Sequence, residues 1–156
     1  MKSVYRVLAY VIAALVAVQS AVVVFAIFGL FAWVDAGGVM DASAQQTASF
    51  TGDIGFMLHG IGGQIVVPFI GLLLVISSFF AKIPGGVKWA LIVFASIVLQ
   101  VAMGLFAFGA PALGLLHGLN AMVLFGLAVT AAMRVGRATA GAVSDTRTES
   151  AAAPVV

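Results

Sequence analysis

Four long apolar stretches, separated by shorter polar segments, dominate the pattern along the chain. They cover residues 4–33, 54–80, 87–108 and 112–133. Each has the roughly 20 apolar residues that a helix needs to cross the hydrocarbon core of a bilayer. No stretch alternates apolar and polar residues in the way a membrane barrel strand does. The pattern predicts an all-α fold, an integral membrane four-helix bundle over residues 1–137.

Composition agrees with lipid as the solvent around these stretches. The 156 residues are 63% hydrophobic and 8% charged, whereas soluble domains are about 25% charged. Such a chain has too few polar side chains to cover a surface in water. We therefore expect a multi-pass protein of the cell membrane whose first partner is the lipid bilayer. The chain contains no cysteine, which excludes disulfides and thiolate metal sites.

Charged residues predict the orientation of the bundle. The basic residues that flank the four stretches all fall on one side, here called the inner side: Lys2, Arg6, Lys82, Lys88, Arg134 and Arg137. The opposite, outer side carries Asp35, Asp41 and Asp53 and has no lysine or arginine. By the positive-inside rule, both the N and the C terminus are expected to be cytoplasmic. The net charge of +2 is spread along the chain, so no nucleic-acid partner is expected.

Three further segments carry expectations of their own. The first apolar stretch is much longer than the roughly 7–15 residues of a signal-peptide core, so we expect an uncleaved helix. Residues 138–156 are small and polar, which predicts a disordered cytoplasmic tail. Residues 34–52 form the one long connection, and loops of that length are often functional.

Two histidines lie within apolar stretches in similar settings. His59 stands in FMLHGIGG and His117 in LGLLHGLN. Asp53 marks the outer start of one stretch and Pro111 that of the other, and each histidine follows six residues later. At 1.5 Å per residue, both imidazoles are about 9 Å below the outer boundary. Ionisable side chains inside a membrane are costly and mark functional sites, so two at one depth predict a shared site between facing helices.

Small and amide residues surround the two histidines. Glycines here either leave space beside an imidazole for a flat macrocycle or let the helices pack closely. These glycines are Gly60, Gly62, Gly63 and Gly118. A slightly deeper layer of amides consists of Gln64, Gln100 and Asn120. We expect these amides either to hydrogen-bond between helices or to orient a ligating histidine, and we expect Gln19 to be an interhelical contact.

The two halves of the chain resemble each other weakly. The first and third stretches each contain a glutamine followed by phenylalanines, in VQSAVVVFAIFGLFA and LQVAMGLFAFGAPA. The second and fourth stretches each contain histidine, glycine and an aliphatic residue in succession. Two helical hairpins in the same orientation would give this pattern, and so would chance similarity between apolar sequences.

Two axial imidazoles from facing helices suit a haem iron in the core of a helical bundle. Because the chain has no Cys-x-x-Cys-His sequence, we expect b-type haem (haem b) held by His59 and His117, for electron transfer or haem handling. A redox partner, a respiratory-complex partner or a second copy of the chain would then be the protein partner. The outer side offers no basic side chain to the haem propionates, so backbone amides or water would have to solvate them.

Two alternatives remain open. A copper or zinc site would combine the two histidines with nearby thioethers, from Met57, Met103 or Met122. A cofactor-free accessory subunit or assembly factor of a membrane complex would use the histidines for polar contacts alone. The spans contain no complete catalytic constellation, so no enzyme activity is predicted.

On these residues the chain resembles one half of haem A synthase, a membrane enzyme that oxidises a haem methyl group. The resemblance covers about residues 4–134 and rests on His59 and His117, which match the family's histidines on the second and fourth helices. It implies a bis-histidine haem bundle. The family has two such halves and a glutamate one turn before the histidine of the second helix, where this chain has Phe56. Haem A synthase activity is therefore not expected.

The stretches GFMLHG, SFFAKIPGGVKW and LGLLHGLNAMVLFGLA are also similar to small four-span membrane proteins of actinobacteria. This second resemblance implies no particular activity.

Overall fold

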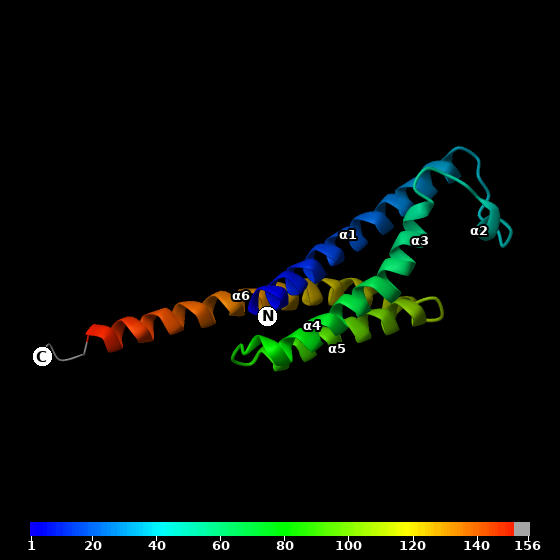
Figure 1. Ribbon diagram of the computed structural model, residues 1–156. Helices are drawn as coiled ribbons and strands as arrows, with labels where there is room; N and C mark the ends of the chain where they lie inside the picture. The colour runs from blue at the N-terminus through cyan, green and yellow to red at the C-terminus, as the bar shows by residue number, and fades with distance from the viewer. Residues whose placement is uncertain (152–156) are drawn as a thin grey trace, which may run out of the picture.

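The computed structural model describes residues 1–151, and the side chains of residues 1–44 and 47–135. Helices account for nearly all of the described chain, which contains no strand (Figure 1). In chain order the elements are α1 (Lys2–Asp35), α2 (Ala44–Thr47), α3 (Ile54–Ile61), the π-helical segment η1 (Gly62–Val66), α4 (Val67–Ala81), α5 (Gly86–Phe106) and α6 (Pro111–Ala151). The all-α prediction is confirmed for this part of the chain.

Four helical spans are long and apolar enough to cross a membrane. They are span one, Lys2–Asp35; span two, Ile54–Ala81, formed by α3, η1 and α4; span three, Gly86–Phe106; and span four, Pro111–Val135. These bounds confirm the four predicted stretches to within a few residues. The predicted disordered tail, residues 138–156, lies outside the residues whose side chains are described and stays a prediction.

Local sequence signals set the ends of the spans. The Asp53 carboxylate accepts a hydrogen bond from the Ile54 backbone N–H at the start of α3. Lys82 adopts a left-handed conformation, with φ of 50°, at the end of α4. Gly85, with φ of 70°, precedes α5, and such positive φ angles cost glycine little. Pro111 is the first residue of α6, a position whose N–H has no partner within the helix, so the missing N–H of proline costs nothing there.

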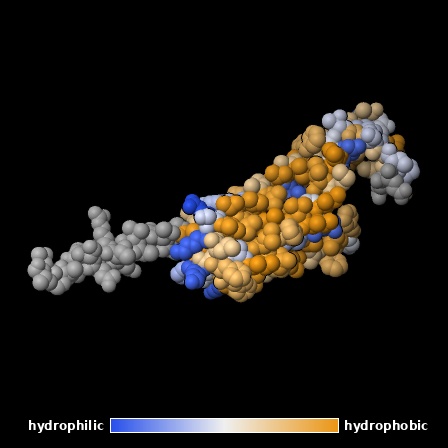
Figure 2. All heavy atoms as spheres, in the orientation of Figure 1, coloured by the Kyte–Doolittle hydropathy of each residue, from blue (hydrophilic) through white to orange (hydrophobic). Residues whose placement is uncertain are grey.

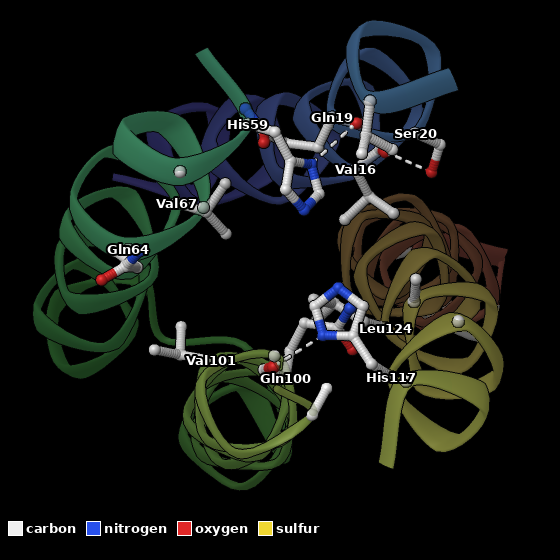
Figure 3. A pocket seen from close by; sticks show the side chains of 18 of the residues that line it. Val16, Gln19, Ser20, His59, Gln64, Val67, Gln100, Val101, His117 and Leu124 are labelled. Carbon is white, nitrogen blue, oxygen red and sulfur yellow. Dashed lines mark hydrogen bonds between the residues drawn. The ribbon is translucent and has the colours of Figure 1, made fainter. Parts of the chain in front are cut away.

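The four spans form a ring in which each packs against two neighbours. Span one contacts α4 and α6, and α5 also contacts α4 and α6. Span two therefore lies diagonally opposite span four, and span one diagonally opposite span three. Figure 3 shows this ring in a view along the bundle. A side chain that points inward from span two thus faces one that points inward from span four.

The half of the bundle nearer the basic side, here called the inner half, is densely packed. Its largest fully buried side chains include Tyr5, Ile12, Leu74 and Val93. Fully buried alanines from three spans, Ala9, Ala90, Ala128 and Ala131, fill the space between them. Small residues allow helix backbones to approach closely, and such packing is the main source of helix association in lipid.

Two contacts hold the inner end of the bundle together. The Tyr5 hydroxyl donates a hydrogen bond of 3.1 Å to the Gly86 backbone oxygen, joining α1 to the start of α5. The Arg134 guanidinium lies 4.4 Å from the centre of the Trp89 ring, joining α6 to α5. These contacts bring the N-terminus, the α4–α5 turn and residue 134 to one end, so the predicted basic residues up to Arg134 lie together. The side chain of Arg137 lies outside the described residues.

The outer half is more open, because span one is longer than span three. At 1.5 Å per residue, α1 is about 51 Å long and α5 about 31 Å. Figure 1 shows α1 and α3 extending together beyond the turn between α5 and α6. Large apolar side chains cover the outward faces of the spans, and Figure 2 shows them as a continuous apolar surface between two more polar ends. This surface fits contact with a lipid bilayer.

Candidate functional site

The two histidines lie face to face in the outer half of the bundle. His59 comes from α3 and His117 from α6. Their ring centroids are 6.0 Å apart and their planes meet at 66°. Figure 3 shows the rings pointing toward one another across the space between the four spans. The structure thus brings together the pair that matched depths had predicted.

Each imidazole is held by a backbone carbonyl of the preceding span. His59 Nδ1–H donates to the Gln19 backbone oxygen at 3.0 Å, and His117 Nδ1–H donates to the Gln100 backbone oxygen at 2.9 Å. A carbonyl oxygen can only accept, so both Nδ1 atoms carry a proton, and in the neutral form of each ring Nε2 is the nitrogen with a free lone pair. The free nitrogen of each ring points into the space between them (Figure 3).

A cavity of about 660 Å³ surrounds the two free nitrogens. All four spans contribute to its wall, which is mostly apolar. Its floor is a layer of one aliphatic side chain from each span: Val16, Val67, Ile97 and Leu124. These four are between 0% and 6% exposed, so the cavity ends where the packed inner half begins. Ligand pockets in proteins typically measure about 300–1,000 Å³, which places this cavity among them.

The spacing of the two rings fits a single metal ion between them. Two imidazoles that bind one ion through Nε2 from opposite sides, in a straight line, have ring centroids about 6.3 Å apart when each metal–nitrogen distance is about 2.0 Å. The observed 6.0 Å is close to this value. Gln19 and Ser20 on span one, and Gln100 and Gly104 on span three, line the cavity between the two histidine-bearing spans.

Three of the four predicted glycines leave open space beside the histidines. A Cβ at Gly118 would meet nothing within 4 Å, and one at Gly60 or Gly63 would meet only a glutamine amide, at 3.8–3.9 Å. All three line the cavity. Gly62 has a different role, because a Cβ there would overlap the side-chain amide of Gln19. The structure places Gly62 against span one, outside the cavity wall.

Gly104 is a site residue that sequence reasoning missed. A Cβ at this position would lie 3.0–3.1 Å from the Cε1 and Nδ1 atoms of His117. The missing side chain therefore lets the imidazole lie directly against the backbone of α5. Its sequence context, MGLF, offers no local signal beyond the small residue itself.

The amides divide between helix packing and support of the histidines. Asn120 Nδ2 donates to the Ser96 backbone oxygen at 3.0 Å and to Gln100 Oε1 at 2.8 Å, while its own oxygen accepts from the Ser96 hydroxyl at 3.2 Å. Asn120 therefore joins α6 to α5 beside the carbonyl that holds His117. Gln64 lines the cavity with an exposed side chain. Gln19, expected only as an interhelical contact, also holds His59 through its backbone oxygen.

A π-helical turn follows His59 and sets its direction. The Val67 N–H bonds to the Gly62 carbonyl five residues earlier, instead of the carbonyl four residues earlier. Pro68 contributes to this departure, because its ring cannot donate a bond and clashes with the carbonyl four residues before it. One extra residue in the turn rotates α3 by about 100° relative to α4. Such turns are frequent at functional sites.

Of the three methionines expected near a copper site, one lines the cavity. Met122 lines the cavity, whereas Met57 is 53% exposed on the outward side and Met103 is buried away from the cavity wall. Within the described residues, no group of three histidine, cysteine, aspartate or glutamate side chains is arranged to hold a metal ion.

The outer connection between α1 and α3 has its own polar structure. The Asp41 carboxylate accepts hydrogen bonds from the Ala44 N–H, the Ser43 hydroxyl and the Ser43 N–H, at 2.7–2.9 Å. These donors stabilise the ionised form, so the pKa of Asp41 lies below its usual range, chiefly because of the Ala44 N–H. Phe50 packs between Trp33 and Phe56, with ring centroids 6.0 and 6.4 Å away.

Comparisons of the chain with known protein families, with curated proteins and with solved structures find no match. The resemblance to one half of haem A synthase accordingly stays a prediction from sequence.

Proposed function

We propose that this protein is a membrane haem protein that binds b-type haem through the Nε2 atoms of His59 and His117. One observation carries the proposal: two imidazoles of fixed tautomer present free nitrogens to each other at a ring spacing of 6.0 Å, inside a cavity of about 660 Å³.

The residues of the chain have separate tasks in this proposal. A bis-imidazole haem b supplies a one-electron carrier when bound. The Gln19 and Gln100 carbonyls fix the tautomer and the direction of each ring. The glycines at positions 60, 63 and 118 leave room for a flat group, and the mostly apolar cavity wall would contact its apolar faces.

The site belongs to the extracytoplasmic half of the protein in this proposal. The basic end, with both termini, would be cytoplasmic by the positive-inside rule. The haem would then serve electron transfer or haem handling near the outer surface, with a redox partner or a respiratory complex on that side. The propionates would be solvated by water or backbone amides, because the outer connections carry no lysine or arginine.

An absorption spectrum of the purified protein tests this proposal. Protein made in haem-replete cells, or mixed with hemin, should show a Soret band and a sharp alpha band on reduction. His59→Ala and His117→Ala should each abolish the low-spin bis-histidine spectrum. Leu119→Ala, which removes a side chain that is 58% exposed, is the matched control and should leave the spectrum unchanged. A colourless protein that takes up no hemin would contradict the proposal.

Copper is the second candidate, favoured by the position of Met122 in the cavity wall beside the two imidazoles. Stoichiometric copper in the purified protein, without porphyrin, would support this reading over haem. A protein with neither metal nor porphyrin that co-purifies with a membrane complex, independently of both histidines, would instead indicate an accessory subunit.

A further inference from the structure

The two histidines occupy equivalent positions in two similar half-sites. In each half-site a glutamine carbonyl holds the imidazole, Gln19 for His59 and Gln100 for His117. A glycine follows each histidine directly. The half-sites differ three residues after the histidine, where one has Gly62 and the other has Asn120. This difference decides how firmly each imidazole is held.

The half-site of His117 is fixed by side-chain bonds between α5 and α6. Asn120 donates to Ser96 and to Gln100, and it accepts from the Ser96 hydroxyl. Its bond to Gln100 Oε1, at 2.8 Å, anchors the residue whose carbonyl holds His117. The imidazole also lies against Gly104, with no side chain between ring and backbone. The turn that joins the two helices is short, spanning residues 107–110.

The half-site of His59 lacks the corresponding bonds. Where Asn120 would stand, Gly62 leaves room for the Gln19 side chain. Gln19 Nε2 donates to the Leu58 backbone oxygen at a long 3.4 Å, and its Oε1 atom is buried without a hydrogen-bond partner. Only the bond from His59 Nδ1 to the Gln19 carbonyl, at 3.0 Å, is short. Fewer short hydrogen bonds therefore fix the position of His59 than fix the position of His117.

The backbone around His59 is also built to move more easily. α3 has only eight residues, ends at the π-helical turn, and makes its extensive contacts with α1. Its outer end joins a connection of residues 36–53. Glycines at positions 60, 62 and 63 cost helix stability next to the turn. α3 can therefore rotate about η1 while α4 keeps its place in the packed inner half.

From this asymmetry we propose that the two ligands are unequal. His117 is the anchoring ligand, and His59 is the ligand that releases, by rotation of α3 about Gly62–Val66, when the porphyrin enters or leaves. In that step the bond from His59 Nε2 to the metal breaks or forms, with no change in oxidation state. Asn120, Ser96 and Gly104 are positioning residues for the anchoring ligand. This inference rests on the proposed haem function.

Hemin affinities of single-histidine variants give the first test. His59→Ala should weaken hemin binding by no more than about 10-fold, whereas His117→Ala should weaken it beyond the roughly 100-fold that loss of a supporting group can cost. Equal losses, or a larger loss in His59→Ala, would overturn the inference. If the wild-type protein binds no hemin, both the proposed function and this inference are wrong. If the wild-type protein shows a bis-histidine spectrum but the two variants lose hemin affinity equally, only this inference is wrong.

The equivalent positions 62 and 120 give a matched second test. Asn120→Ala should speed hemin transfer to an excess of a haem-scavenging protein by about 10-fold to 100-fold, because it frees the anchoring half-site. Gly62→Ala should change the transfer rate by less than about threefold, because the Gln19 side chain can move aside. This change is well below the one expected when a group that supports a ligand is lost. Gly126→Ala, where a Cβ meets nothing within 4 Å, is the control on α6. Equal acceleration by the variants at 62 and 120 would contradict the inference.

Hydrogen exchange on the protein without hemin tests the hinge independently of ligand binding. Backbone amides of α3 should exchange faster than those of the first ten residues of α6, at the same depth in the bundle. Added hemin should slow the α3 amides more than the α6 amides. If the amides of the two segments exchange at equal rates without hemin, the proposed rotation of α3 is wrong, whatever the hemin affinities of the variants show.

Discussion

The inner and outer halves of this bundle are both built mainly from apolar residues, but one half is packed solid and the other encloses a cavity. In the inner half, alanines and large aliphatic side chains from four spans fill the core, and a tyrosine and an arginine close its end. In the outer half, the same spans separate around a cavity whose wall contains glycines, glutamines and two histidines. The floor of Val16, Val67, Ile97 and Leu124 divides them.

This difference suggests that the inner half provides stability and the outer half provides the binding site. Close packing of small residues holds helices together in lipid, so we expect the inner half to contribute most of the stability of the bundle. The outer half is then free to keep a cavity, an unpaired Gln19 oxygen and a π-helical turn, each of which lowers stability. Changes in the outer half should therefore alter binding, while changes in the inner half should alter folding.

Deletion of Gly63 should have the largest effect of the changes considered, and it should alter the site in the outer half without altering the fold. Loss of one residue from Gly62–Val66 converts the π-helical turn to an ordinary helical turn and rotates His59 by about 100° away from His117. We expect complete loss of the bis-histidine spectrum, with helicity by circular dichroism unchanged. Substitution Ile65→Ala, which keeps the register at a side chain that is 63% exposed and does not line the cavity, is the control and should retain hemin. A bis-histidine spectrum in the deletion variant would show that the turn does not set the direction of His59.

Leu74→Ala should destabilise the inner half. Leu74 is fully buried, and its truncation leaves a cavity that costs about 2 kcal/mol or more. Leu72→Ala on the same helix, where the side chain is 46% exposed, is the matched control and should cost much less. Reversible unfolding in mixed detergent micelles measures both. Equal destabilisation by the two variants would contradict the assignment of stability to the packed half.

Gly104→Ala should disturb the site without unfolding the bundle. The added methyl group would press on the His117 ring at 3.0–3.1 Å and tilt it from its carbonyl partner. We expect about 10-fold weaker hemin binding, in the range seen when a supporting contact is lost. Gly114→Ala, whose Cβ meets its nearest neighbour at 3.8 Å, should bind hemin as the wild type does. Unfolding midpoints should be the same for both variants.

The smallest effect concerns the outer connection at low pH. Because the pKa of Asp41 is lowered in the folded protein, its contribution to the turn is present above the ordinary carboxyl pKa of about 3.9. The contribution is lost as the pH falls through the lower, folded pKa. The protection of the Ser43 and Ala44 amides, taken relative to the intrinsic exchange rate at each pH, should therefore fall on acidification, and Asp41→Asn should remove that dependence. The protection of amides in the inner half should stay unchanged over the same range.

The sequence predicted the spans well because each depends on a property of many residues. A run of about 20 apolar side chains satisfies the bilayer only as a helix, and Asp53, Lys82 and Pro111 mark ends by their own chemistry. The approach of His59 to His117 was also predictable, because equal distance from two helix starts gives equal depth.

The details of the site were less predictable because they depend on single contacts between distant residues. The extra residue in the π-helical turn has no sequence signal stronger than Gly62, Gly63 and Pro68. The part played by Gln19 follows from its backbone oxygen, which every residue possesses, so the side chain gave no hint of it. The importance of Gly104 depends on where His117 lies across the helix interface.

The aliphatic floor beneath the cavity limits how the protein can respond to the membrane potential. Within the described residues, the floor consists of four side chains at most 6% exposed, backed by a packed and mainly apolar half-bundle. Proton transfer needs polar groups or water, so on the proposed topology protons would reach the site from the outer surface. With the histidines about 9 Å deep in a hydrocarbon core of about 30 Å, each proton would cross about a third of the field. A potential of 100 mV would then contribute less than about 1 kcal/mol to each proton's arrival.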